Sequence, residues 1–117
     1  MQLRRRIDYH RLAAECADLA EAADRQGNPE MARVAWSAAA RHEHQTLCDL
    51  LAEYPERIRT IGFVAVNEAA YWWRAGRREL AVQRVHEIIE TCPNLWPWAV
   101  GQLLGFMNET LAEAGNN

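Results

Sequence analysis

The residues best suited to chemistry are His42, His44 and Cys48, in the middle of the chain. His44 and Cys48 are four residues apart, so a helix would present both on one face, and imidazole and thiolate are ligands that zinc prefers. A zinc site needs a third and a fourth ligand, and the chain has no Cys-x-x-Cys pair. Further ligands would have to come from distant segments: His10, His86 or Cys92. We therefore expect solvated or hydrogen-bonded histidines and assign no metal or other cofactor.

No catalytic motif accompanies these residues. The sequence contains no nucleophile elbow, no phosphate-binding loop and no glutamates paired with a histidine at di-metal spacing. Glu43 lies between His42 and His44, and we interpret it as part of an exposed helix surface. Arginines that could bind phosphate have acidic neighbours, so we expect them to be solvated. The sequence therefore predicts a protein that is not an enzyme.

Length and composition narrow the class of protein further. The chain has 117 residues, half of them apolar, which suits a single domain over residues 1–117. The net charge of −3 gives no electrostatic reason to bind nucleic acid. No apolar run approaches the length of a membrane span and no signal-peptide core follows the basic N-terminus, so we expect a cytoplasmic protein without membrane association. The three cysteines are widely spaced, and we interpret Cys16 and Cys48 as small buried hydrophobes.

Apolar periodicity predicts an all-α fold of five helices. The first two expected helices cover residues 8–26 and 31–54. The third runs from Glu56 to a break at Gly76, and the fourth begins after Arg78 and stops at Pro93. The last helix covers residues 97–114. Asn28 and Pro29 form an N-cap and first-position pair for the second helix. The connections are short, so consecutive helices should be antiparallel neighbours. The apolar stripe of the second helix thins at residues 41–45, where a bend or break is expected.

Four further features predict how these helices pack. Trp72 and Trp73 cannot face the same way on one helix, so one should be core and the other partly exposed. Gly101 and Gly105 lie about one turn apart in the last helix and would allow a close crossing. On the fourth helix, charged residues including Arg84 should face away from the core. The first helix carries an apolar stripe of Leu12, Cys16, Leu19, Ala20 and Ala23.

The hairpin at residues 67–93 resembles the tetratricopeptide repeat (TPR) pattern. The residues that carry the resemblance are Ala69, Trp72, Gly76, Ala81, Val85, Ile88 and Pro93. The chain departs from the pattern at Ala65, Glu68 and Ile88, where the family usually has tryptophan, leucine and alanine. A related pattern of glycine, two residues, glutamate, a long apolar residue and alanine begins at both position 27 and position 76, 49 residues apart rather than the 34 of a regular array.

The resemblance implies two helix-turn-helix hairpins with a C-terminal capping helix, and a concave groove lined by the first helix of each unit and by the last helix. The first unit would contribute Ala17, Glu21, Asp24 and Arg25. The partner-binding residues would be Phe63, Val66, Ala70, Trp73, Arg74, Val100, Leu104 and Met107. Such an apolar groove suits an amphipathic helix or an apolar peptide. It lacks the lysine and asparagine cluster of TPR proteins that bind chaperone tails.

The function implied by the resemblance is a protein–protein interaction module, an adaptor or small chaperone that holds an apolar segment of another protein. Two alternatives stay open. The chain's own helices or a second copy would fill the groove in a homo-oligomerisation or regulatory domain. More remotely, a metal-binding sensor or enzyme would use His44 and Cys48.

Overall fold

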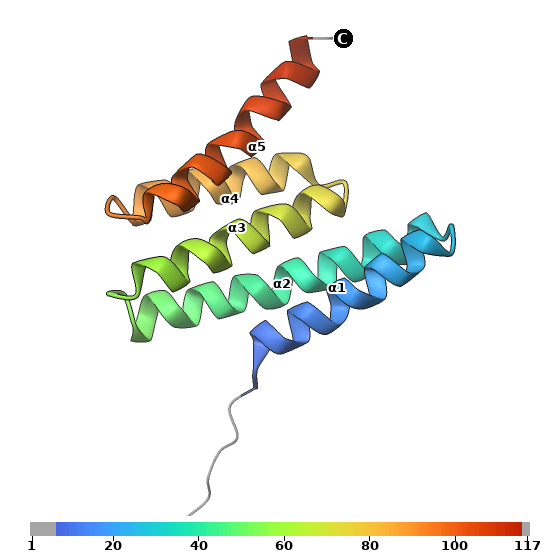
Figure 1. The fold of residues 1–117 in the computed structure, drawn as a ribbon, viewed down its shortest axis with the longest axis horizontal. Coiled ribbons are helices and arrows are strands. Elements are labelled where there is room, and N and C mark those ends of the chain that lie inside the picture. The colour runs from blue at the N-terminus through green and yellow to red at the C-terminus, as the bar shows by residue number, and fades with distance from the viewer. Residues whose placement is uncertain (1–6, 116–117) are drawn as a thin grey trace, which may run out of the picture.

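A computed structural model describes residues 7–115 of the chain, with side chains over residues 7–109. The described region contains five α-helices and no β-strand (Figure 1). The helices are α1 (Tyr9–Arg25), α2 (Pro29–Glu53), α3 (Ile58–Arg74), α4 (Arg78–Thr91) and α5 (Pro97–Gly115). The predicted all-α class is confirmed, and each predicted helix lies within about two residues of an observed one. None of the helices in this region is both long and apolar enough to cross a membrane.

Local signals set the helix ends. The Asp8 side chain accepts a hydrogen bond from the backbone at the start of α1, and the Asn28 side chain does the same for α2, with Pro29 in the first turn. Gly27 and Gly76 have φ values of 73° and 77°, a backbone conformation that favours glycine and that ends α1 and α3. The turns at these two glycines are therefore where the sequence predicts them.

α2 runs without interruption from Pro29 to Glu53, so the bend or break expected at residues 41–45 is absent. The apolar stripe thins there because its core position is taken by Glu43, which is fully buried. The interpretation of Glu43 as a surface residue is wrong. A carboxylate occupies a place that the helical pattern reserves for an apolar side chain.

The helices pack as a staggered row (Figure 1). α1 contacts α2, α2 contacts α3, α3 contacts α4, and α5 packs on both α3 and α4. The radius of gyration is 15.1 Å, compared with about 13 Å for a compact domain of this length. Each helix is therefore stabilised mainly by its neighbours in the row and not by one central core.

The interface between α1 and α2 is built from alanine. The buried residues of α1 are Ala13, Ala17, Ala20 and Ala23. Leu12 and Cys16 are only partly buried, and Leu19, predicted to be in the apolar stripe, is 66% exposed. Small side chains let two helices approach closely, and this contact leaves no place for a leucine at position 19.

Two helices approach each other closely at Gly62 of α3. A Cβ atom at this position would be 2.8 Å from the Cβ of Ala99 in α5, closer than two carbon atoms can pack. The close crossing predicted at Gly101 and Gly105 is wrong, because a Cβ atom at either position would meet nothing within 4 Å. The glycine that lets α5 dock is therefore in α3, not in α5.

We expect Gly62→Ala to destabilise the fold by about 1–3 kcal/mol, because α5 must shift to accommodate one methyl group. The matched variant Gly101→Ala should stabilise it by about 0.5–1 kcal/mol, because alanine is a better helix former and the site is open. Urea unfolding of both variants measures the two effects. Equal stabilisation by the two substitutions would show that α5 does not dock at Gly62.

Candidate functional site

Two carboxylates without access to water are the unusual feature of the interior. Among the described side chains, only Glu43 of α2 and Glu68 of α3 are both charged and buried, with exposures of 0% and 1%. Removing a carboxylate from water costs several kcal/mol unless hydrogen bonds and opposite charge replace the water. Each carboxylate must therefore recruit donors from neighbouring helices.

Glu43 recruits its donors from both sides. The Nδ1 atom of His10 in α1 lies 2.9 Å from one carboxylate oxygen and 3.1 Å from the other. The side-chain amide of Asn67 in α3 donates to the second oxygen over 3.1 Å. One buried group therefore fixes the position of α2 relative to both α1 and α3.

Glu68 has the same role in the next helix of the row. The Nδ1 atom of His44 in α2 lies 2.8 Å from one oxygen, and the indole N–H of Trp72 donates to the other over 2.8 Å. The Nε atom of Arg84 in α4 lies 3.3 Å from that second oxygen. The carboxylate is therefore satisfied by groups from α2, α3 and α4.

Arg84 does not face away from the core as the helical pattern predicts. Its side chain is only 27% exposed, and its Nε atom is buried at ion-pair distance from Glu68 without a well-aligned hydrogen bond. The far end of the guanidinium donates to Glu87 over 2.8 Å. This hydrogen bond lowers the pKa of Glu87 below its ordinary value. Arg84 therefore links a buried carboxylate to a surface one.

His44 connects this network to a thiol. A carboxylate only accepts hydrogen bonds, so the contact with Glu68 requires the hydrogen of His44 to be on Nδ1 in the neutral ring. The opposite atom, Nε2, is then an acceptor, and it lies 3.5 Å from the Sγ atom of Cys48. His44 and Cys48 share a helix face as predicted. Cys48 is exposed, so its interpretation as a buried hydrophobe is wrong.

The thiol opens into a small hollow of about 90 Å³. Its polar lining comes from His44, Cys48, Glu68, Arg84, Glu87 and Thr91. Desolvation, followed by the charge of Glu68, raises the pKa of the Cys48 thiol above its ordinary value. The thiol is therefore neutral at physiological pH, with a hydrogen-bond acceptor beside it.

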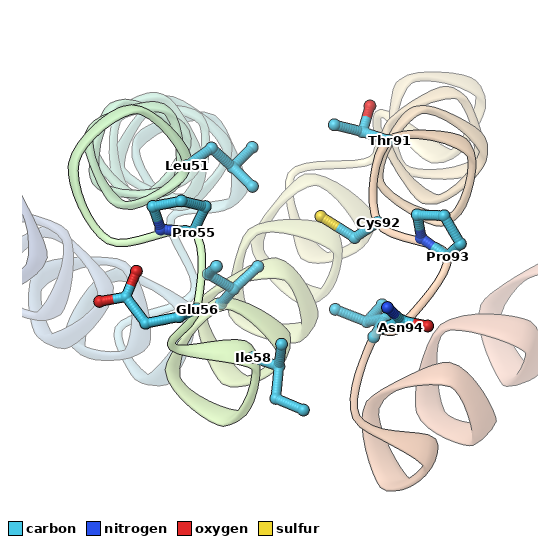
Figure 2. Close-up of a pocket in the computed structure, with 10 residues that line it drawn as sticks. Leu51, Pro55, Glu56, Ile58, Thr91, Cys92, Pro93 and Asn94 are labelled. Atoms are coloured by element: carbon cyan, nitrogen blue, oxygen red, sulfur yellow. The ribbon is translucent and has the colours of Figure 1, made fainter.

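A larger groove of about 460 Å³ adjoins the hollow, and Leu51 and Thr91 line both. In Figure 2, Leu51 and Pro55 face Thr91 and Cys92 across an open gap, with Ile58 below. The groove lies between the turn that joins α2 to α3 and the turn that joins α4 to α5. Its lining is mainly apolar, and Glu56 is its one charged residue. The described structure thus places a hollow that contains the Cys48 thiol beside a larger, mainly apolar groove.

The predicted partner-binding residues divide into three sets. Val66, Val100 and Met107 are partly buried against the core, and Ala70 is also partly buried. Trp73 is partly buried and its ring contacts Phe106 of α5, at 5.6 Å between centroids. The exposed apolar members are Phe63, at 48%, and Leu104, at 42%. α5 therefore covers much of the surface that the resemblance implies for a partner.

The two adjacent tryptophans behave as predicted. Trp72 is 4% exposed and bonded to Glu68, whereas Trp73 is only partly buried. Arg74, the last predicted partner-binding residue, is exposed and lies over the ring of Trp36, 5.0 Å from its centroid. This cation–π contact stabilises the packing of α3 on α2.

Sequence reasoning missed the buried carboxylates, and each left a signal. Glu68 occupies the position where the TPR pattern usually has leucine, and Glu43 interrupts the apolar stripe of α2.

In the described residues, no group of three or more histidine, cysteine, aspartate or glutamate side chains is arranged to hold a metal ion. No protein-family model, curated protein or solved structure matches the chain.

We expect Glu68→Leu to destabilise the fold by about 3–5 kcal/mol, although leucine is the usual residue of the TPR pattern there, because Arg84 would lose its buried counter-ion. The control Glu90→Leu, at an exposed position of α4, should change stability by no more than about 0.5 kcal/mol. Chemical denaturation of both variants compares the two sites. A Glu68→Leu variant as stable as the parent would contradict the structural role given to this carboxylate.

Proposed function

We propose that the protein is an interaction module, an adaptor or small chaperone, that holds an apolar helix or peptide of another protein. The groove between the α2–α3 and α4–α5 turns is the main support for this proposal (Figure 2). Its volume of about 460 Å³ falls in the range of sites that hold ligands. Ile58, at 41% exposure, and Leu51 present apolar surface that a partner segment would remove from water.

We further propose that α1–α2 and α3–α4 are antiparallel, TPR-like hairpins and that α5 is the capping helix. Support comes from the left-handed glycines at both turns, from the row-like packing and from the sequence pattern that the two turns share. The groove proposed here for the partner lies at the ends of α2 and α4 and contains none of the partner-binding residues that the resemblance implies. The surface around Phe63 and Leu104 is a second contact region, because α5 covers the rest of it.

A site-specific cross-linker tests the groove directly. A photoreactive amino acid at Asn94, on the rim of the groove, should capture a partner protein in cells of the source organism, and the cross-linked segment should be apolar. The same amino acid at His86, exposed on α4 outside the groove, is the control. Capture of the chain's own copies alone would favour the homo-oligomerisation alternative.

Blocking the groove should weaken binding of the captured partner. Thr91 is exposed on the groove wall, so Thr91→Arg should raise the dissociation constant by about tenfold or more, which corresponds to about 1.4 kcal/mol. His86→Arg adds the same side chain elsewhere on α4 and should leave the affinity unchanged. Calorimetric titration of both variants with the captured segment measures the difference. Equal affinities would place the partner on another surface.

A further inference from the structure

Cys48, His44 and Glu68 form a chain of contacts whose geometry suits nucleophilic chemistry. Sγ of Cys48 lies 3.5 Å from Nε2 of His44, and Nδ1 of the same ring lies 2.8 Å from the buried carboxylate. A nucleophile beside a base, with the base oriented by a third group, is the arrangement that activates cysteine and serine nucleophiles. The thiol is exposed, and His44 is 33% exposed, so a reagent can reach both.

We propose that Cys48 is a nucleophilic thiol that exchanges with neutral, apolar disulfides, with His44 as its general base and Glu68 as the residue that positions His44. Sγ of Cys48 attacks one sulfur of the disulfide R–S–S–R, and a new S–S bond forms as the old one breaks. The thiol proton passes to Nε2 of His44 and then to the departing thiolate. The products are the mixed disulfide at Cys48 and one molecule of R–SH.

The electron balance of this step is complete without another oxidant, because the incoming disulfide is reduced as Cys48 is oxidised. Burial and the nearby acids raise the pKa of Cys48, so the resting group is a thiol and the proton must leave as attack occurs. Glu68 completes the arrangement by stabilising the imidazolium that forms. His44 is well placed for this transfer, since its contact with Glu68 leaves Nε2 unprotonated in the neutral ring.

The surroundings of the thiol select the class of disulfide. Glu68, Asp49 and Glu87 raise the pKa of Cys48 through their negative charge, and Arg84 lowers it. Three acids face one arginine at the thiol, so the net negative charge repels an anionic reagent. The hollow at Cys48 adjoins the apolar groove through Leu51 and Thr91, so an apolar R group has a surface on which to lie. A mixed disulfide at Cys48 would place R at the entrance to the groove.

The two other cysteines provide an internal comparison. Cys16 and Cys92 are partly buried, and burial raises the pKa of each thiol. Among the residues that the structure describes, Cys48 is the cysteine with a hydrogen bond to a histidine. Cys92 lines the apolar groove that adjoins the hollow of Cys48, so it is a nearby thiol without the base (Figure 2).

Three single-cysteine proteins, each with the other two cysteines changed to alanine, test the proposal. Reaction with dithiodipyridine, a neutral disulfide, releases a chromophore whose rate can be followed by stopped-flow absorbance. We expect the protein that retains Cys48 to react about 100-fold faster than the other two, the size of a general-base effect. It should also prefer dithiodipyridine over the dianionic dithiobis(nitrobenzoate).

His44→Gln separates catalysis from packing, because glutamine can donate a hydrogen bond to Glu68 but cannot accept the thiol proton. In the Cys48 protein this variant should lower the rate by about 100-fold while circular dichroism and thermal unfolding show an intact fold. If the His44→Gln variant unfolds, the reaction rates of the three single-cysteine proteins test the proposal without it. Similar rates for all three thiols, or a rate unchanged by His44→Gln, would overturn the proposal. The test does not depend on whether a protein partner binds the groove.

Discussion

The buried carboxylates of Glu43 and Glu68 are the constraint on which the arrangement of these helices depends. Apolar contacts between helices are non-directional, and the alanine interface of α1 offers little apolar area. A carboxylate that has lost its water is different, because it is tolerated only with donors at short distances and in fixed directions. Glu43 draws donors from α1 and α3, and Glu68 from α2 and α4. Together they set the register of the first four helices.

The same network shapes the surface beside it. Because Glu68 binds Nδ1 of His44, the other ring nitrogen, Nε2, is directed at Cys48. Glu68 also holds Arg84 inward, so polar atoms of both residues line the hollow between α2 and α4. A leucine at position 68 would instead extend the apolar core. The larger groove that adjoins this hollow is mainly apolar. Stability and a candidate reactive thiol thus depend on one buried group.

The helices can be predicted from the sequence because their signals are local. Asn28, Gly27 and Gly76 act through their own backbone or that of the next turn. The errors concern contacts between distant residues. The charge of Glu43 predicts a surface position, whereas the partners that allow its burial are 33 and 24 residues away in the chain.

The docking of α5 is a second long-range contact that periodicity does not encode. It depends on the absence of a side chain at Gly62 of α3 opposite Ala99, so a pattern within α5 alone points to the wrong glycines. The prediction of a partner surface around Trp73 does not include the docking of α5. Phe106 of α5 already contacts the Trp73 ring. Tertiary geometry, not helix propensity, decides which apolar face stays open.

The most direct test of this network is the tautomer of His44, measured by long-range proton–nitrogen NMR on uniformly labelled protein. If Glu68 orients this ring, the neutral form carries its hydrogen on Nδ1 and leaves Nε2 unprotonated toward Cys48. A hydrogen on Nε2, or rapid averaging between the two tautomers, would contradict this role of Glu68. It would mean that the buried carboxylate neither fixes His44 nor prepares it to accept the thiol proton.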